Sequence, residues 1–483
     1  MNRRLPALIA FVVAPLALLS LYPLGVVGEA PQPAIPTFAA LGAPTMPFVP
    51  KASFINSTWF CGGVPNTADH TGGFVIVANT TDAPLVAHLT VYTDAVGVPA
   101  AEQSFEVPPR DTWQQVLSEV QPQGTYLSAM VEVAGGGGFV EQQANTTVGN
   151  AVSPCSNSTS SAWYFADNYT LNGSSEDLVI TNPFPDDAIL DFTFASNDGT
   201  RKPQNLQGFP VPGNSVVVVP EDNLPKDEAV LAVTIAATRG RVVAARAQTY
   251  LGERTGYSNT LGAPSLSAEW WFADGENSAD VIFERYSIYN PTDADVTVTT
   301  DFWGLNDHPE FVGYRTDVVT AGNVLSFTTK DFSGVPEGRH GMTFATEGAS
   351  SIIVERGITR RAGEGFATTV VVGAPMVFTG YTRWSMAVGT DLSVDNVLVV
   401  MNLDFADTTV AVKALGPGGE VAVPGLEAVP LPKSGIATIT IPDQEAALGV
   451  PLIVESAQRI VVERLLPRGG ELRGRSGSLA LPG

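Results

Sequence analysis

The chain has 483 residues, of which 49 are acidic and 26 are basic, so its formal net charge is −23. A charge of this sign and size repels phosphate backbones and anionic lipid headgroups, which makes nucleic acid a poor candidate partner. After an N-terminal segment, the length fits four domains of about 100 residues each.

Residues 1–28 have the plan of a signal peptide or a membrane anchor. Arg3 and Arg4 precede the run from Leu5 to Val27, which carries no charged residue. Such a run either is cleaved as a Sec signal or stays in the membrane as a helix, and both alternatives place the rest of the chain outside the cytoplasm. Because Pro31 follows the small-residue site closely, we favour a retained helix that makes the membrane a partner.

Residues 29–52 are rich in Pro, Ala and Thr and show no hydrophobic period. A segment of this composition is typical of a semi-extended spacer. We therefore expect it to hold the first folded domain away from the membrane.

Four repeats follow the spacer, and each opens with a tryptophan. The tryptophans are Trp59, Trp163, Trp270 and Trp384. The spacing between successive tryptophans corresponds to a whole domain and is far longer than the unit of a solenoid. We place β-sandwich repeats at residues 53–157, 158–266, 267–379 and 380–483.

Within each repeat, short runs rich in Val, Ile, Thr and Phe alternate apolar and polar residues, which predicts strands. One run per repeat ends in an asparagine followed by turn residues, at Asn79, Asn182, Asn290 and Asn402. Asn and Asp bond their own backbone in turns, so this position predicts a hairpin. The expected fold is all-β, with four tandem immunoglobulin-like β-sandwich repeats after an N-terminal apolar helix and a Pro/Ala-rich spacer.

A later strand of each repeat carries Gln142, Arg246, Arg356 or Arg464, preceded in three repeats by Glu. Repeat 2 has Ala245 at the Glu position. A residue that recurs in every copy builds the fold more readily than it performs a reaction, so we expect a structural ion pair or a turn clamp. Because adjacent strand residues face opposite ways, we expect one of Glu355 and Arg356 to meet solvent.

These motifs carry a resemblance. Repeats 2 and 3 share Phe-Ala-Asp after the tryptophan (165–167 and 272–274), Asn-Pro at the strand end (182–183 and 290–291), and Gly-Ala-Pro before the next tryptophan (262–264 and 373–375). The ordered recurrence resembles the tandem β-sandwich repeats of actinobacterial envelope proteins, a domain-of-unknown-function family. The resemblance spans about residues 51–483, and it implies a fold and an envelope address but no activity.

The sequence offers no catalytic or metal-binding constellation. It contains no nucleotide-binding glycine motif, no hydrolase nucleophile motif and no zinc-protease motif. The histidines do not pair at ligand spacing, so we expect solvated surface histidines and no zinc. The histidines are His70, His88, His308 and His340. We expect no cofactor and no catalytic residue.

Acidic pairs in the turns leave one alternative open. Asp186 with Asp187, Asp293 with Asp295, and Asp391 with Asp395 offer the oxygen ligands that calcium prefers at domain junctions. No calcium-loop spacing surrounds them, so we favour solvated turns.

Two tryptophans and two cysteines are the remaining candidate site residues. Trp113 and Trp303 have no counterpart in the other copies, which makes them candidate glycan contacts. Cys61 and Cys155 are the only cysteines and lie at the two ends of repeat 1, so we predict a disulfide in an oxidising compartment.

The expected function is a non-catalytic, extracytoplasmic scaffold, spacer or adhesion protein of the cell envelope. The alternative is a glycan-binding module that assists cell-wall polysaccharide metabolism. The partners are therefore the membrane, through the N-terminal helix, and either a cell-wall glycan or another envelope protein. A carboxylate pair at glycosidase spacing would instead indicate an enzyme.

Overall fold

The structure is a computed structural model that describes residues 46–66, 72–147, 149–196, 199–219, 221–308, 313–348, 350–362, 365–387, 396–441, 449–467 and 475–483. The predicted signal or anchor at residues 1–28 and most of the predicted spacer lie outside these residues. Among the described residues, no helix combines the length and the apolar character needed to cross a membrane. The borders of the four repeats remain predictions, and their numbers are kept below.

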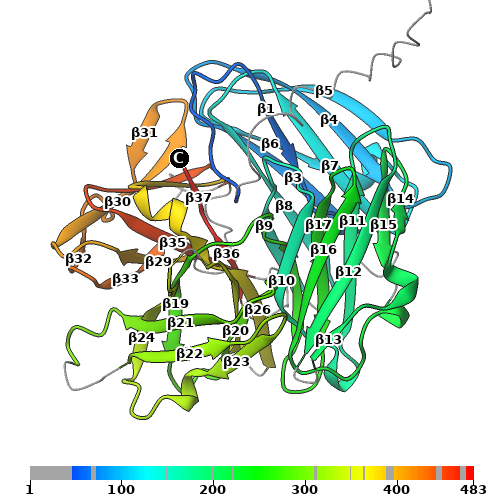
Figure 1. Ribbon diagram of the computed structural model, residues 1–483. Coiled ribbons are helices and arrows are strands. Elements are labelled where there is room, and N and C mark those ends of the chain that lie inside the picture. The colour runs from blue at the N-terminus through cyan, green and yellow to red at the C-terminus, as the bar shows by residue number, and fades with distance from the viewer. Residues whose placement is uncertain are drawn as a thin grey trace, which may run out of the picture. The chain divides into compact units, whose positions relative to one another are not determined.

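The described chain is built almost wholly of antiparallel strands, which confirms the predicted fold class (Figure 1). Repeat 1 supplies two sheets. The first has the order β1 (Ser57–Phe60), β7 (Tyr126–Val133), β4 (Leu85–Thr93) and β5 (Ala101–Val107), with β2 (Val64–Pro65) also on β7. The second has the order β6 (Thr112–Val116), β3 (Gly72–Asn79), β8 (Gly138–Thr146) and β9 (Gly149–Pro154). The short helix α2 (Leu117–Val120) follows β6.

Repeat 2 has the same plan. Its first sheet is β10 (Ala162–Asn168), β16 (Leu231–Arg239), β12 (Ala188–Ser196) and β13 (Gly199–Arg201), with β14 (Phe209–Val211) on β12. Its second sheet is β15 (Ser215–Val219), β11 (Ser175–Asn182), β17 (Val243–Tyr250) and β18 (Gly256–Leu261).

The first sheet of repeat 3 is β22 (Arg315–Val319), β21 (Val296–Trp303), β24 (Gly338–Thr346), β19 (Glu269–Asn277) and β27 (Ala374–Pro375). Its second sheet is β23 (Val324–Thr328), β20 (Val281–Tyr289), β25 (Ile353–Ala362) and β26 (Gly365–Val372). In repeat 4 the first sheet is β31 (Gly419–Ala422), β30 (Thr408–Gly416), β34 (Leu452–Ser456), β28 (Arg383–Met386) and β37 (Leu481–Pro482), with β32 (Val429–Leu431) on β30. The second is β33 (Ile436–Ile441), β29 (Asn396–Asn402), β35 (Ile460–Pro467) and β36 (Arg475–Leu479).

Each repeat keeps the two central strand pairs of an immunoglobulin-like sandwich. In repeat 1 these are β3 with β6 and β4 with β7, which correspond to the B–E and C–F pairs. The outer strands differ, because β1 joins β7 and β8 joins β3. The last strand, β9, therefore lies at a sheet edge, and its counterparts β18, β26 and β36 do the same.

The recurrent asparagines close the predicted hairpins, and all four are fully buried. The amide nitrogen of Asn182 donates to the carbonyl oxygens of Asp186 at 2.8 Å and Val211 at 3.1 Å, while its amide oxygen accepts from the backbone of Phe184. The other three asparagines make the corresponding bonds. Each asparagine thus ties its own turn to a second loop of the sandwich.

The recurrent tryptophans are structural. Trp59, Trp163, Trp270 and Trp384 are fully buried. In repeats 2, 3 and 4 the indole N–H donates to a backbone carbonyl at 2.8 to 2.9 Å, which satisfies the polar edge of the ring inside an apolar core.

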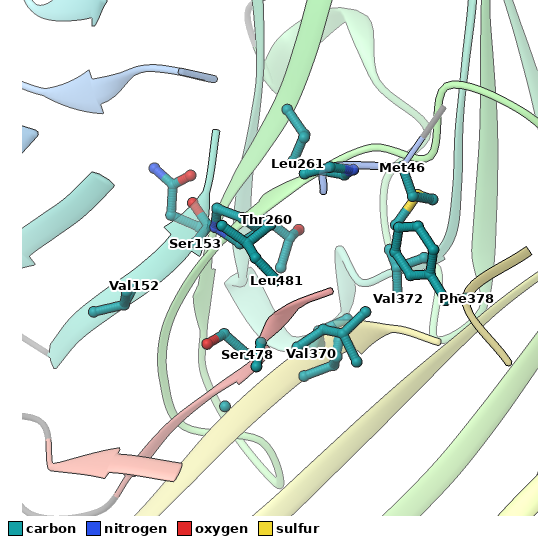
Figure 2. A pocket seen from close by; sticks show the side chains of 17 residues that line it. Met46, Val152, Ser153, Thr260, Leu261, Val370, Val372, Phe378, Ser478 and Leu481 are labelled. Carbon is teal, nitrogen blue, oxygen red and sulfur yellow. The ribbon is translucent and has the colours of Figure 1, made fainter. Parts of the chain in front are cut away.

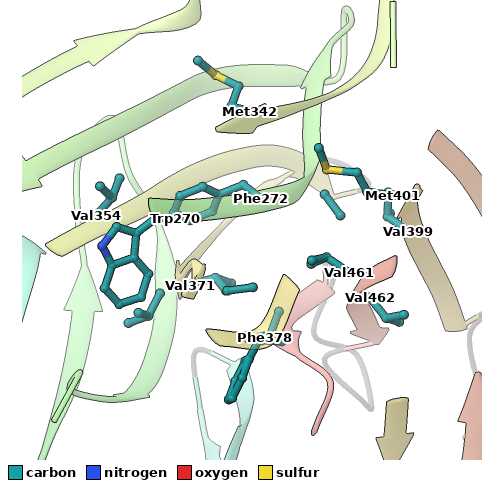
Figure 3. Close-up of a cluster of buried hydrophobic side chains, with 14 of the residues drawn as sticks. Trp270, Phe272, Met342, Val354, Val371, Phe378, Val399, Met401, Val461 and Val462 are labelled. Carbon is teal, nitrogen blue, oxygen red and sulfur yellow. The ribbon is translucent and has the colours of Figure 1, made fainter. Parts of the chain in front are cut away.

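The hydrophobic core runs without a break from repeat 3 into repeat 4 (Figure 3). Trp270, Phe272 and Met342 of repeat 3 belong to the same buried cluster as Met401 and Val461 of repeat 4. Burying apolar area between repeats stabilises their arrangement at about 25 cal/mol per Å². The repeats of residues 44–483 therefore form one unit.

The edge strands of the four repeats meet one another in cyclic order. Strand β9 contacts β18, β18 contacts β26, β26 contacts β36, and β36 contacts β9. The last repeat thus contacts the first, and the repeats close into a ring. Residues that precede repeat 1 take part, since the backbone N–H of Val49 donates to the carbonyl of Pro482 at 2.7 Å.

Candidate functional site

A buried glutamate and a buried arginine join neighbouring repeats. Between repeats 2 and 3, both guanidinium N–H groups of Arg246 donate to the carboxylate of Glu355 at 3.2 Å. The same carboxylate accepts the backbone N–H groups of Ala166 at 2.8 Å and Asp167 at 2.6 Å. The glutamate of the later repeat is therefore bound by four donors of the earlier one.

The next two junctions repeat the arrangement. Between repeats 3 and 4, Arg356 donates to Glu463 at 3.2 and 2.8 Å, and the backbone of Ala273 donates at 2.7 Å. Between repeats 4 and 1, Arg464 donates to Glu141 at 2.9 Å. These charges are fully or almost fully buried, so each carboxylate depends on its guanidinium.

The recurrent Glu-Arg dipeptide follows from strand geometry. Successive strand residues leave opposite faces, so Glu355 reaches back to repeat 2 while Arg356 reaches forward to repeat 4. The prediction of a structural ion pair is confirmed. The expectation that one of the two residues meets solvent is wrong, because a neighbouring repeat covers each face and both are fully buried.

The junction between repeats 1 and 2 has no Glu–Arg pair, and its one charged bond is from the hydroxyl of Tyr126 to the carboxylate of Asp177 at 2.6 Å among the described residues. Gln142 stands at the arginine position and Ala245 at the glutamate position. The amide of Gln142 donates to Asn259 at 3.1 Å and accepts from the backbone of Gly63 at 3.2 Å, and Asn259 donates to the carbonyl of Gly63 at 2.8 Å. A β-carbon on Gly62 would lie 2.3 Å from that of Ala245, so the two backbones approach closely.

The aspartates after the tryptophans add a second set of buried charges. Asp167 accepts from Arg254 at 3.1 Å, from the Nε of Arg285 at 3.0 Å and from the hydroxyl of Ser287 at 3.1 Å. Burial works to raise the pKa of Asp167, but the two guanidinium groups outweigh it and hold the pKa below its ordinary value. Since Arg285 and Ser287 belong to repeat 3, Asp167 also joins two repeats.

Asp274 is also a buried, ionised acceptor, but its arginine partners belong to its own repeat. Arg339 and Arg360 both donate to its carboxylate. Burial again opposes ionisation, and Arg360 and Arg339 lower the pKa of Asp274 despite it. These arginines have no counterpart in the recurrent sequence pattern, so the pattern does not indicate them.

A small cavity lies where the four edge strands meet (Figure 2). Val152, Leu261, Val371 and Leu479, one from each repeat, contribute to its largely apolar lining. Its volume of about 50 Å³ holds a few water molecules and lies well below the range of small-molecule sites. We therefore assign it to packing at the ring axis.

A much larger groove of about 820 Å³ lies between repeats 1 and 2, at the junction without a Glu–Arg pair. Strands β4, β5 and β7 supply one wall through His88, Thr90, Glu102 and Glu132. The second wall comes from the turns at Pro183 and Pro212 and from the edge strand β15. Sequence patterns gave no signal for this groove, because its walls are about 50 to 130 residues apart in the chain.

The candidate glycan contacts lie apart from the cavity and the groove. Trp113 is partly buried and stacks on Phe105 at 3.5 Å between ring centroids. Trp303 is also partly buried, with Trp271 at 5.1 Å and Phe405 of repeat 4 at 6.3 Å. The indole of Trp303 donates to the hydroxyl of Thr343 at 3.2 Å. Their role as glycan contacts stays a prediction.

The cysteine prediction is confirmed. Cys61 and Cys155 are bonded, at a sequence separation of 94. The bond lies beside the bridge between Phe60 and Ser156, where the end of repeat 1 returns to its first strand. It therefore fastens the exit of the repeat to its entry.

The histidines differ in their surroundings. His88 lies in the groove wall and His308 in a loop, whereas His70 lies outside the described residues. The expectation of solvated histidines is wrong for His340, which is fully buried with its Nε2 3.3 Å from a carboxylate oxygen of Glu284. The packed ring of Phe302 helps to exclude water there.

The acidic pairs fit the expected turns. The carboxylates of Asp187 and Asp295 each accept one backbone N–H, from Gly213 at 3.1 Å and Ala321 at 2.9 Å. Asp391 and Asp395 lie outside the described residues. In the part of the chain that the structure describes, no three His, Cys, Asp or Glu side chains gather as a metal site.

Part of the chain matches one family model, and none of the comparisons gives an activity. Residues 137–374 match the model of DUF5719, a family of unknown function. No curated protein matches. Among solved structures, that of Thermotoga maritima 1070 aligns at 10% identity and a TM-score of 0.19, over 23% of this chain and 94% of that one. The tetra-tandem repeat from the extending region of a large adhesion protein aligns at 14% identity and a TM-score of 0.11, over 88% and 99%.

Proposed function

We propose that the protein is a non-catalytic, extracytoplasmic scaffold of the cell envelope, in which four β-sandwich repeats form a rigid platform. The observation that carries the proposal is the position of the recurrent charged residues. The junctions between repeats bury and pair the recurrent charges, which are Arg246, Arg356, Arg464 and their glutamates. Their chemistry holds the platform together.

The location rests on two features. The apolar run of residues 5–27 has the plan of an export signal or anchor. The disulfide between Cys61 and Cys155 supports an oxidising compartment, because such bonds persist outside the cytoplasm. Fractionation of the native host should recover the protein with the envelope or the medium, and a cytosolic pool with free thiols would contradict the location.

A complementation experiment tests the scaffold role. A deletion strain with a measurable envelope defect should be rescued by wild-type protein and by variants that replace single exposed acids or histidines. A scaffold tolerates each of these changes, whereas an enzyme loses activity with one catalytic group. One exposed substitution that abolishes rescue without lowering the melting temperature would contradict a non-catalytic role.

A glycan-binding function is the second candidate, and one aromatic surface favours it. Phe405 is 81% exposed and lies beside Trp303, which in turn lies beside Trp271. Aromatic rings of this kind offer apolar faces to ligands. Binding to purified cell-wall glycan should fall in Phe405→Ala and Trp303→Ala, with Trp113→Ala testing the other site. Unchanged binding in all three variants would remove this candidate.

A further inference from the structure

The groove between repeats 1 and 2 has the dimensions of a ligand site. Its volume of about 820 Å³ falls within the range of small-molecule and short-peptide pockets. It lies at the junction that has no buried ion pair, where Gln142 and Asn259 replace the charges. The junction least occupied by structural charge is therefore the one that leaves open space.

The strand register sets the chemistry of the first wall. On one row His88 of β4 lies opposite Glu132 of β7, and on the next row Thr90 lies opposite Glu102 of β5. His88 approaches Glu102, with 3.6 Å between the imidazole Nε2 and the carboxylate. The described lining residues include no lysine or arginine. The wall is thus negatively charged.

One carboxylate of the groove lining already accepts hydrogen bonds from the protein. Asp94 accepts from the backbone and hydroxyl of Thr125 and from the backbone of Tyr126. Glu102 and Glu132 are left to face the groove, and the side chain of Glu102 is 66% exposed. Both carboxylates attract a positively charged ligand group placed between them.

Thr90 lines the floor of the groove and is 6% exposed. Its hydroxyl makes no hydrogen bond within the described residues, and the oxygen keeps contact with solvent. A ligand donor or acceptor in the groove can therefore bond to this hydroxyl. Tyr92, which is 2% exposed, adds an aromatic ring beside it.

The second wall provides backbone hydrogen-bonding groups. Ser215 to Val217 lie in β15, the edge strand of its sheet, which pairs with β11 on one side. An edge strand leaves hydrogen-bonding groups for an added extended chain. The turn from Pro212 to Asn214 continues this uncharged wall.

We propose that this groove binds an extended polypeptide segment of a partner protein through a lysine or arginine side chain placed between Glu102 and Glu132. The cation pairs with the two carboxylates, its stem packs on Tyr92 and Met130, and the segment runs along β15. The proposal adds a ligand class to the proposed scaffold and rests on that function only for its biological meaning. Binding to the purified chain is measured independently of envelope location or rescue.

The first experiment uses the full chain and a fluorescent hexapeptide, Ala-Ala-Val-Lys-Val-Ala, in an anisotropy titration. A matched peptide with norleucine in place of lysine is the control. The lysine peptide should bind more tightly, and added salt should weaken it because exposed charges are screened. Equal binding of both peptides overturns the proposal. Binding of spermidine without binding of the peptide also overturns it, since the site would then take small amines.

The second experiment places the peptide in the groove. Glu132→Gln and Glu102→Gln should each weaken binding by about fivefold, as expected for loss of one partly exposed ion pair. Glu106→Gln is the matched control, because Glu106 lies exposed on the same strand β5 outside the groove lining. All three variants should melt like the wild type. Peptide affinity that is equal in the three variants contradicts the assigned site.

Discussion

The guanidinium of Arg464 lies 2.9 Å from the carboxylate of Glu141, although 323 residues separate them in the chain. This pair joins the last repeat to the first and does the work that Arg246 and Arg356 do at the two preceding junctions. A linear array would leave the glutamate of its first repeat without a partner. In the ring every recurrent glutamate has one.

Replacing Arg356 by Ala should strongly destabilise the protein. The change leaves Glu463 buried without its guanidinium, and breaking a buried pair in this way costs about 3 to 5 kcal/mol. Arg459→Ala is the control, because the Arg459 side chain is 48% exposed and its pair with Asp404 contributes about 1 kcal/mol or less. Urea unfolding compares them. Equal midpoints for the two variants would show that the buried pair has no structural role.

Reduction of the disulfide should lower the stability of repeat 1. The bond closes a loop of 94 residues, and the chain-entropy account assigns about 4 to 5 kcal/mol to a loop of that length. The Cys61→Ser, Cys155→Ser double variant should melt below the oxidised wild type and should not respond to dithiothreitol. A wild-type melting temperature that is the same with and without reductant would refute the assigned role.

Adding one methyl group at Gly62 should weaken the junction between repeats 1 and 2. The new β-carbon would lie 2.3 Å from that of Ala245, so the backbones must move apart. Overpacking of this kind costs about 1 to 3 kcal/mol. Gly416→Ala is the matched control, since no atom lies within 4 Å of a β-carbon built there. If Gly62→Ala is as stable as Gly416→Ala, repeats 1 and 2 do not pack as described.

Glu176 should make stability fall as the pH rises. The residue is fully buried and both carboxylate oxygens lack a hydrogen bond, and burial raises its pKa to about 8 from the ordinary 4.5. The folded chain holds a proton that the unfolded chain releases, so unfolding becomes easier from pH 4.5 towards pH 8.

The matched variant Glu176→Gln keeps the shape and removes the titration. Its melting temperature should exceed that of the wild type at pH 8 and approach it at pH 4.5. Glu106→Gln, at an exposed site, should show no such divergence. Parallel curves for wild type and Glu176→Gln across this range would refute the assignment.

The sequence predicted the parts of the fold that depend on local chemistry. Alternating Val and Ile runs formed strands, and Asn182 bonded its own turn as asparagine does in hairpins. The pair of cysteines was found because the chain has no others. Each of these signals lies within one strand or turn, or uses a residue type with one available partner.

The ring could not be predicted in the same way. The partner of Arg246 is Glu355, 109 residues away, and a repeated motif does not say whether its pairs form within a repeat or between repeats. One signal was present, since Gln142 and Ala245 depart from the motif at positions that face the same junction. The loss of both charges together marks partners, because either charge alone would be buried unpaired. Arg254 and Arg285 beside Asp167, and Arg339 and Arg360 beside Asp274, lie outside the motif and gave no signal.

A double-mutant cycle between Arg464 and Glu141 tests the closed ring most directly. Arg464→Met, Glu141→Gln and the double variant are unfolded in urea, and the coupling free energy is the departure from additivity. Contacting residues couple by about 0.5 to 3 kcal/mol, whereas distant ones add. The ring predicts that the double variant loses less stability than the sum of the single variants. Strict additivity would contradict contact between the first and last repeats and therefore the ring itself.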